Sequence, residues 1–397
     1  MPGTDRRVVV LNAGSSSLKF AAYPPDPEAP PLLSGAVDGI GNSAHLKIMD
    51  ADGRVTHDIA VSASDPHAAM AILAGLKDGP LAGDLAAFGH RIVHGGPDLD
   101  RSVVVDEATL ARIEAVSPLA PLHNPPALDV LKGLQKRFPR VPHVACFDTA
   151  FHRGHPAVAD RFAIPDSLYQ EGVRRYGFHG LSYQYIAGAM QTKAPEIAGG
   201  KVVAAHLGSG ASMCALMDGH SIDSSMGFTA LDGLPMGTRS GSLDAGVILW
   251  LQQQKGWSVD RVEHFLYHDC GLQGLSGLSN DIRVLLASDA PLAKMAVDYF
   301  VYHIARTAGA LAVSMGGIDG LVFTAGIGEH SVPIRARVLA RLRWLGFDVD
   351  ETANQRGQGR ITASSSRLRA YIIPTDEERV IARETIGLLS GRWLTVC

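Results

Sequence analysis

The chain has 397 residues, of which 46% are hydrophobic, enough for two domains with substantial cores. Only 19% of the residues are charged and the net charge is −4, which argues against a surface for nucleic acid or anionic membranes. The four cysteines form no CxxC pair, so reduced thiols are expected rather than disulfides or a zinc site. No apolar run is long enough for a signal-peptide core or a membrane span, and we expect a soluble, cytoplasmic protein.

Strand-like and helical segments alternate along the chain, which is typical of an α/β fold. Strands are expected at residues 8–12, 18–23, 45–50, 54–61, 141–147, 201–207, 212–217, 320–326 and 369–374. Proline is tolerated in the first turn of a helix and marks helix starts. Three helices are therefore expected to begin near Asn124, near Pro291 and near Ser331.

The first predicted hairpin has a counterpart near the middle of the chain. VVVLNAGSSSLKFAAY (8–23) aligns with VVAAHLGSGASMCALM (202–217), with Gly14 on Gly208 and therefore an offset of 194 residues. A match at half the chain length suggests two similar halves. Small residues let backbone N–H groups approach an anion, and two such turns facing across a cleft could hold a polyphosphate. A plain hairpin with serine-rich turn chemistry is the alternative, while a P-loop fits poorly because GxxxxGK[ST] is absent.

Several other segments place a charged side chain or an imidazole beside glycines or at a strand end. They are GHRIVHGG with Arg91, PLAPLHNPP with His123, ACFDTAFH with Asp148, RRYGFHG with His179 and MGTRSGS with Arg239. Singly, each has a structural or surface explanation. Together they fit phosphoryl transfer, which needs fixed positive groups and Mg²⁺. A carboxylate acceptor is already a nucleophile, so it needs charge shielding by arginines rather than a general base.

The stretches NAGSSSLKF, HRIVHGG, PLAPLHNPPAL, FDTAFH, RRYGFHG, SMGFTALDGLPMGTRSG, GLSNDIR, FTAGIGE and IPTDEER occur in this order from residue 8 to about 385. They resemble the acetate kinase family and its propionate kinase relatives. The resemblance implies a duplicated α/β fold, actin-like and sugar-kinase-like, with two domains and a nucleotide cleft between them. It places the domains at 1–150, completed by a C-terminal helix at 382–397, and at 151–381. It also implies a homodimer.

The resemblance further implies roles for individual residues. Arg91 and Arg239 would flank the acyl phosphate, His179 would stabilise the transition state, and Asp148 would be the active-site acid. The acyl substrate would contact Arg91, Val93, Leu122, His123, Phe178 and Ala230. ATP would contact Ser15, Ser17, Lys19, His206, Gly208, Ser209, Gly210, Asp281, Ile282, Arg283, Gly326, Ile327, Gly328 and Glu329. Asn12 and Glu377 would lie in the shell of Mg²⁺, with Mn²⁺ as an alternative ion.

Two helix caps follow from local patterns near these segments. Thr375 with Glu378 three residues later forms a capping-box pattern, which leaves Glu377 free to face the cleft. Ser242 stands where the family often has Asp, and Ala245 where it often has Pro; Ser242 is still expected to cap the following helix.

Three further departures from the family pattern concern binding. Ser209 replaces the usual Asn, so the amide donor of the asparagine is lost. The loss of this hydrogen bond is worth roughly 0.5–1.5 kcal/mol and would weaken nucleotide binding about tenfold. His330 replaces the usual Asn after GIGE and leaves the base preference open. Ala230 replaces a common Pro beside the substrate methyl group, which would deepen the acyl pocket.

Together these features predict reversible, Mg²⁺-dependent transfer of the γ-phosphoryl group of ATP to acetate, giving acetyl phosphate and ADP. Ala230 keeps propionate open as the acceptor, since one methylene changes binding by only ~1–3 kcal/mol. Ser209 and His330 keep pyrophosphate or another nucleotide open as the donor. A non-catalytic actin-like nucleotide-binding scaffold is the alternative from another class, but a scaffold has no need of Arg91, Arg239 and His179.

Overall fold

The computed structural model describes residues 6–14 and 16–393, and its chain divides into two compact units. The first unit comprises Met1–Phe151 and Asp376–Cys397, and the second His152–Thr375. The second boundary lies six residues before the predicted domain boundary at 382. That these units act as the two functional domains stays a prediction.

The first unit is built on an eight-stranded sheet in the order β5-β4-β3-β2-β1-β6-β8-β7. Its strands are β1 (Arg6–Ala13), β2 (Ser17–Tyr23), β3 (Leu33–Asp38), β4 (His45–Asp50), β5 (Val55–Ala60), β6 (Asp84–Ile92), β7 (Val103–Val104) and β8 (His143–Phe147). Its helices are α1 (Pro66–Gly75), α2 (Glu107–Val116), α3 (Asn124–Arg137) and α16 (Glu377–Trp393). Apolar side chains of one sheet face, including Val9, Leu11 and Phe88, pack with Leu73 of α1 and Val130 of α3 in one core.

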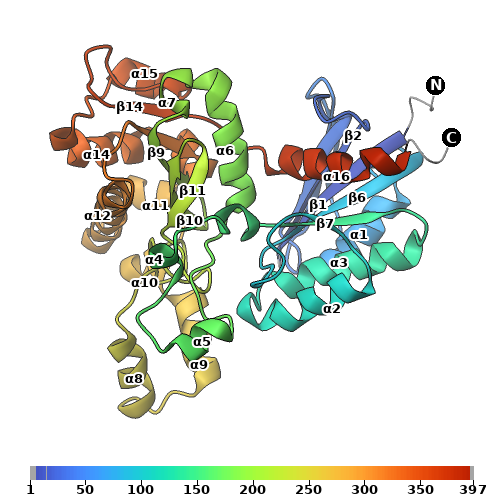
Figure 1. Cartoon of the computed structure of the whole chain (residues 1–397), viewed down its shortest axis with the longest axis horizontal. Coiled ribbons are helices and arrows are strands. Elements are labelled where there is room, and N and C mark those ends of the chain that lie inside the picture. Colours follow the sequence, from blue (N-terminus) through green and yellow to red (C-terminus); the bar gives the residue numbers. More distant parts are fainter. Residues whose placement is uncertain (1–5, 15, 394–397) are drawn as a thin grey trace. The chain divides into compact units, whose positions relative to one another are not determined.

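Helix α16 closes the first unit although it comes from the C-terminal end of the chain. It packs against β1 and β6 (Figure 1). Gly89 of β6 makes this approach possible, because a Cβ there would lie 2.5 Å from Thr385 Oγ1 and 2.6 Å from Ile381 Cγ2. The packing brings the start of α16, with Glu377, to the sheet that carries Asn12 and Arg91.

The second unit is built on a six-stranded sheet in the order β11-β10-β9-β12-β14-β13. Its strands are β9 (Lys201–Leu207), β10 (Ala211–Met217), β11 (His220–Ser224), β12 (Gly320–Thr324), β13 (Gly359–Arg360) and β14 (Arg369–Ile372). Its helices are α4 (Ala157–Asp160), α5 (Asp166–Gln170), α6 (Gly180–Lys193), α7 (Pro195–Ala198), α8 (Ala245–Gln253), α9 (Val259–His264), α10 (Gly271–Ser276), α11 (Ile282–Ala287), α12 (Pro291–Ser314), α13 (Ala325–His330), α14 (Val332–Leu342) and α15 (Glu351–Arg356). Both α6 and α12 pack against β9.

The two sheets share the same central arrangement of five strands. The order β3-β2-β1-β6-β8 in the first unit corresponds to β11-β10-β9-β12-β14 in the second. Within each set, the first two pairings are antiparallel and the last two are parallel. The aligned segments 8–23 and 202–217 form the equivalent hairpins β1–β2 and β9–β10. The predicted duplicated α/β fold is confirmed.

Helix starts were easier to predict than some of the strands. Helices α3, α12 and α14 begin at Asn124, Pro291 and Val332, each with proline in the first turn, as predicted. Strands β3, β6, β7, β11 and β13 were not predicted. In β6, the sequence DLAAFGHRI contains residues that are rare in strands, and burial between β1 and β8 outweighs their local preference. The predicted strand 320–326 stops at Thr324, because α13 begins at Ala325, whose φ is 62°.

Both predicted caps are wrong, because an aspartate performs the capping in each case. At α16, the Arg379 N–H donates to Asp376 Oδ1 at 3.0 Å, while the Thr375 hydroxyl accepts from Ser182 Oγ. At α8, Gly246 N donates to Asp244 Oδ1 at 2.6 Å. A carboxylate both accepts the N–H and interacts favourably with the positive end of the helix dipole.

No helix in the described part of the chain has both the length and the apolar character that a bilayer-spanning segment needs.

Buried histidines predict a loss of stability in mild acid. His143 lies 4% exposed beside His90, with Nδ1 of His143 2.9 Å from Nε2 of His90. Burial lowers the pKa of His143 to about 4, and that of His90 well below its usual value. Unfolded histidine, with a pKa near 6.5, therefore binds more protons than the folded state between about pH 6.5 and 4. Stability is retained above this range and falls within it.

We expect the melting temperature to drop as the pH is lowered from 7 to 5, with each such histidine costing up to about 1.4 kcal/mol per pH unit. Thermal unfolding measured at a series of pH values checks this. His143→Gln is expected to reduce the slope, whereas His67→Gln, at an exposed position on α1, is expected to leave it unchanged. Equal slopes in all three proteins would contradict the assignment.

Candidate active site

In the first unit, Arg91 is held by acceptors from two neighbouring strands. It lies near the carboxyl end of β6, and Asp148 follows the parallel neighbour β8, where the Asp148 N–H continues the ladder to Ile92 O at 3.1 Å. Arg91 Nη2 lies 2.5 Å from Asp148 Oδ2 and its Nε 3.1 Å from Oδ1, a two-pronged arrangement. Its Nη1 donates to Asn12 Oδ1 at 3.0 Å. The carboxyl ends of parallel strands are where open α/β sheets bind ligands.

Glu377, from the first turn of α16, completes this cluster. Its Oε2 lies 3.8 Å from Arg91 Nε and accepts from Asn12 Nδ2 at 3.4 Å. Burial disfavours the charge on Arg91, but Asp148 and Glu377 more than offset this and raise the pKa of the guanidinium. The Asp148 side chain is 1% exposed and that of Arg91 19% exposed, so Arg91 is a preorganised, partly accessible cation rather than a member of a solvated surface pair.

The donors around Arg91 suit a hard divalent cation. Mg²⁺ prefers oxygen ligands and is usually held by one or two carboxylates together with substrate phosphates. Asn12, Asp148 and Glu377 supply such oxygens in one cluster, although the described residues contain no group of three or more His, Cys, Asp or Glu side chains with metal-site geometry. The cluster therefore fits a cation that is bound jointly with a phosphate-bearing substrate.

The predicted phosphate turn of the first unit is only partly described. Ser15 lies outside the described residues. Gly14 N donates to Ser17 O at 2.8 Å, which closes the turn between β1 and β2. Lys19 is exposed and pairs directly across from Asn12, so both side chains lie on the sheet face that α16 covers. Burial, then Glu377, raises the pKa of Glu378, while Lys19 opposes the shift.

One buried amide connects the two segments of the first unit that carry residues assigned to the acyl group. Val93 is buried in the loop after β6, and Leu122 and His123 lie half-buried just before α3. The Asn124 side chain connects these segments, because His94 N donates to its Oδ1 and its Nδ2 donates to His94 O, both at 3.0 Å. Sequence reasoning treated Asn124 only as a helix start; an asparagine followed directly by two prolines was the available signal.

In the second unit, His179 lies beside the second glycine turn. It precedes α6 in a left-handed conformation with φ 55°, and such strain is found at functional sites. Its ring stacks on His206 with centroids 4.1 Å apart. A Cβ on Gly210 would lie 3.4 Å from His179 Nε2 and 2.8 Å from Arg239 Nη2. The structure therefore brings His179, Arg239 and the Gly208–Gly210 turn together.

Contacts behind these side chains fix their orientation. Arg239 Nη1 donates to Ala230 O at 2.8 Å, so the residue assigned to the acyl pocket also positions the guanidinium. His206 Nδ1 lies 2.8 Å from Ser182 Oγ, which donates to Thr375 Oγ1 at 2.9 Å. Phe178, next to His179, is 1% exposed.

Ser212 and Tyr183 form a hydroxyl pair behind His179. Ser212 Oγ lies 2.8 Å from His179 Nδ1 and 2.5 Å from the Tyr183 hydroxyl. Burial raises the pKa of Tyr183 well above its usual value, so the phenol stays protonated. With Nδ1 engaged, Nε2 of His179 is the nitrogen that lies near Gly210.

We expect Ser212→Ala to lower kcat about tenfold, since one hydrogen bond that orients the imidazole is lost, and to leave the KM for ATP nearly unchanged. Steady-state kinetics check this. Tyr183→Phe keeps the bond between Ser212 and His179 and is expected to have a smaller effect. A Ser212→Ala enzyme with the kcat of the wild type would show that this contact does not matter.

Seven of the fourteen residues predicted to bind the nucleotide line one cavity of about 780 Å³ in the second unit. The predicted residues in its wall are Gly208, Ser209, Asp281, Ile282, Arg283, Gly326 and Ile327. Residues missed by the sequence analysis are Asn280, Leu286, Ala287, Ser331 and Pro333, and His330 is also present. The cavity combines apolar walls with backbone at the glycine turn, which suits a flat base and a phosphate chain.

Gly328 and Glu329 are outside the lining of this cavity. Glu329 Oε1 accepts from Ala325 N at 2.7 Å and from Thr375 N at 3.2 Å. It therefore supports the left-handed residue Ala325 at the start of α13. A direct contact of Gly328 or Glu329 with the nucleotide stays a prediction.

Comparison with known proteins identifies the family. The model of the acetokinase family matches residues 7–383. An acetate kinase of Nitrobacter hamburgensis is 54% identical over 97% of this chain and 96% of its own length. Among solved structures, a propionate kinase from Francisella tularensis aligns with a TM-score of 0.88 and 35% identity, over 96% of this chain and 100% of its own. An acetate kinase from Porphyromonas gingivalis aligns with a TM-score of 0.84 and 34% identity, over 97% and 100%. The chain belongs to the acetokinase family and is a phosphotransferase with a carboxyl group as acceptor.

Proposed function

We propose that the protein transfers the γ-phosphoryl group of ATP reversibly to acetate, giving acetyl phosphate and ADP, with Mg²⁺ as the cofactor. The observation that carries the proposal is the pair of anchored cationic groups: Arg91 held by Asp148 and Asn12, and Arg239 with His179 at the Gly208–Gly210 turn. A nucleotide-binding scaffold would not need them.

In the proposed reaction, a carboxylate oxygen of acetate attacks the γ-phosphorus directly. The new P–O bond forms as the bond to the β–γ bridging oxygen breaks, and the electron pair leaves on ADP. No general base is required, because acetate is already ionised at neutral pH. Charge on the moving phosphoryl group would be balanced by Arg91, Arg239 and His179 Nε2, each of which is oriented by contacts within its own unit.

Asn12 and Glu377 are the residues proposed to hold Mg²⁺, and Asp148 holds Arg91 beside them. Bound Mg²⁺ would neutralise phosphate charge. The chain's own contribution is to hold the oxygen donors together: Asn12 contacts both Arg91 and Glu377.

The direct test is to trap acetyl phosphate as its hydroxamate with purified protein, acetate and Mg-ATP. Product that depends on all three reagents is the expected result. Binding of ATP without acetate-dependent product would support the scaffold alternative instead. Replacing ATP by pyrophosphate tests the donor, and the 780 Å³ cavity favours a nucleotide because pyrophosphate would leave most of it unused.

Propionate is a second candidate acceptor. Ala230, whose carbonyl holds Arg239, offers a small side chain at the proposed methyl pocket, and a propionate kinase is among the similar structures. Comparing kcat/KM for the two acids decides the question, and a strong preference for acetate would exclude propionate as the main substrate.

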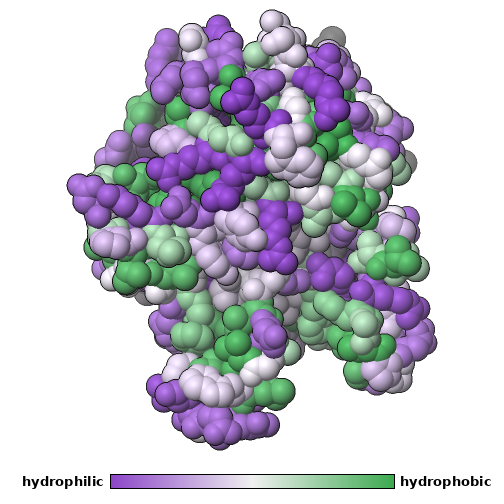
Figure 2. All heavy atoms as spheres, turned by 90° about the vertical axis from the view of Figure 1, so that its left-hand side faces the viewer, coloured by the Kyte–Doolittle hydropathy of each residue, from purple (hydrophilic) through white to green (hydrophobic). Residues whose placement is uncertain are grey.

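A homodimer and a cytoplasmic location stay predictions. Support for association comes from exposed apolar side chains on the second unit, such as Leu249 (53%) and Trp250 (49%) of α8. Figure 2 shows hydrophobic residues interspersed with hydrophilic ones at the lower end of the molecule, where α8 and α9 lie. Light scattering after size-exclusion chromatography measures the mass directly; a monomer would contradict the dimer.

A further inference from the structure

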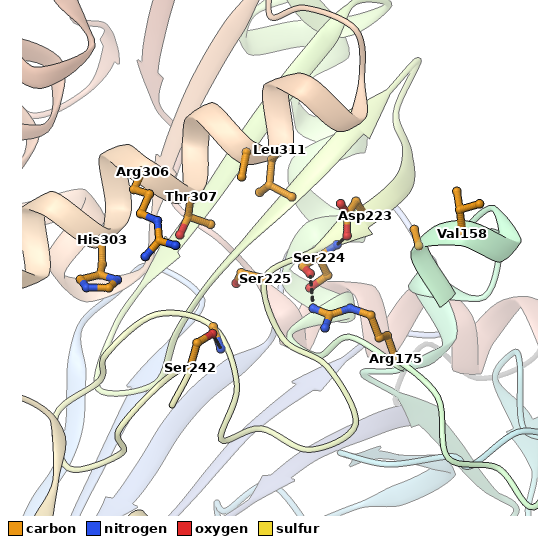
Figure 3. Close-up of a pocket in the computed structure, with 13 residues that line it drawn as sticks. Val158, Arg175, Asp223, Ser224, Ser225, Ser242, His303, Arg306, Thr307 and Leu311 are labelled. Atoms are coloured by element: carbon orange, nitrogen blue, oxygen red, sulfur yellow. Dashed lines mark hydrogen bonds between the residues drawn. The ribbon is translucent and has the colours of Figure 1, made fainter. Parts of the chain in front are cut away.

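The second unit contains another cavity, of about 360 Å³, that shares no lining residue with the nucleotide cavity. His303, Arg306 and Thr307 of α12 form one side, and the end of β11 with Ser225 forms another (Figure 3). Arg175 and the loop residues Gly233 and Ser242 complete the wall.

The lining of this cavity carries two arginines, Arg175 and Arg306, and one carboxylate, Asp223. The guanidinium group of Arg306 is exposed, points into the cavity, and has no hydrogen bond or ion pair with any described residue (Figure 3). Arg175 uses two donors, Nη2 to Ser224 O and Nη1 to Asp232 Oδ2, both at 3.3 Å, and has others left. Burial, and then the charge of Arg306, lowers the pKa of His303, so this imidazole is neutral at physiological pH.

The carboxylate in the wall is already engaged. Asp223 Oδ2 accepts from Ser314 Oγ at 2.6 Å and its Oδ1 from Ser224 N at 2.8 Å. Hydroxyl groups add donors: Ser225 Oγ accepts from Met213 N at 2.8 Å, which leaves its own proton for a ligand, and Thr307 lies on the opposite side. The two arginines outnumber the one carboxylate of the lining, and the hydroxyl groups add donors, so the cavity favours an anion.

We propose that this cavity binds a small dianion, either inorganic phosphate or a short dicarboxylate, between Arg175 and Arg306. Both sources present paired oxygens of the kind that a guanidinium fork accepts. The volume fits such a molecule and is less than half that of the nucleotide cavity.

The site is connected to the loop that carries Ala230 and Arg239. Ser242 Oγ donates to Asp232 Oδ1 at 2.7 Å, and Ser242 N donates to Gly233 O at 2.9 Å. Arg175 binds the other oxygen of Asp232. An anion that binds Arg175 therefore competes with the bond between Arg175 and Asp232, which anchors this loop. If the proposed function holds, the bound dianion changes the KM for the acyl substrate more than the KM for ATP. This part of the inference rests on the proposed function.

Calorimetric titration of the full-length protein tests binding separately from catalysis. Inorganic phosphate and succinate are titrated in parallel into the wild type and into Arg306→Ala, Lys294→Ala and Arg239→Ala. Lys294 is the matched control, an exposed cation on α12 about 18 Å before Arg306 along the helix. At least about tenfold weaker binding is expected in Arg306→Ala, with binding retained in Lys294→Ala and Arg239→Ala. The anion that binds more tightly identifies the source.

Loss of binding in Arg239→Ala but not in Arg306→Ala would place the anion at the active site and overturn the proposal. Absence of binding of both anions to the wild type would also overturn it. The link to the loop is tested by the KM for acetate with and without the bound anion: a severalfold change in the wild type and none in Arg306→Ala is expected. Binding with an unchanged KM would refute the link. An enzyme without acetate kinase activity that still binds the anion would refute only the proposed function.

Discussion

Replacing Arg91 by alanine is expected to lower kcat for acetyl phosphate formation by about 10³-fold and to change the KM for ATP by less than about threefold. Arg91 has a raised pKa and is held by Asp148 and Asn12, so its charge is permanent and its direction is set before substrate binds. Its contacts would strengthen as charge develops on the phosphoryl group, and such contacts act on kcat rather than on ground-state binding.

Arg91→Ala also leaves Asp148 buried without this partner, which can cost about 3–5 kcal/mol of stability. Thermal melting of the variant therefore accompanies the kinetics, and Arg91→Lys, which keeps the charge but loses the two-pronged geometry, separates the effects. We expect Arg91→Lys to melt close to the wild type and to retain intermediate activity. The control is Arg101→Ala, because the Arg101 side chain is 78% exposed. An Arg91→Ala enzyme that folds and keeps the wild-type kcat would refute the proposed role.

Gly210→Ala is expected to lower kcat about 10²-fold with little change in stability. The new Cβ would lie 2.8 Å from Arg239 Nη2, which is closer than real Cβ contacts allow. The atom that must move is the far end of a flexible side chain, so the fold is spared and the guanidinium is displaced. Displacing the Arg239 guanidinium is expected to lower kcat nearly as much as removing it does. The fall in kcat measured for Arg239→Ala is therefore the upper limit for Gly210→Ala.

The matched control for Gly210→Ala is Gly188→Ala in α6, where a Cβ would meet nothing within 4 Å. The kcat values of the wild type, Gly210→Ala, Arg239→Ala and the double variant form a double-mutant cycle. If Gly210→Ala acts through Arg239, adding it to Arg239→Ala has little further effect. Full additivity of the two changes would show that the methyl group acts elsewhere.

Local chemistry explains which parts of the fold could be predicted. Proline fixes φ in the first helical turn, and the starts of α3, α12 and α14 follow from it. The alternation of apolar residues and the Gly-Ser turns predicted hairpins β1–β2 and β9–β10. Strand β6 could not be recognised in this way, because its Gly89, His90 and Arg91 serve helix packing, a buried histidine pair and the site rather than strand propensity.

In the candidate site too, local sequence predicted some features and the packing of distant segments decided others. The sequence by itself determined the family, the repeated halves and the types of side chain that carry the chemistry, since these depend on short motifs and their order. Only the tertiary structure decided that Asn12 meets Glu377 across 365 positions, that Asn124 joins the loop after β6 to α3, and that Glu329 supports Ala325 instead of lining the nucleotide cavity. Such contacts depend on how distant strands and helices pack, and no local pattern in the chain encodes the distance between them.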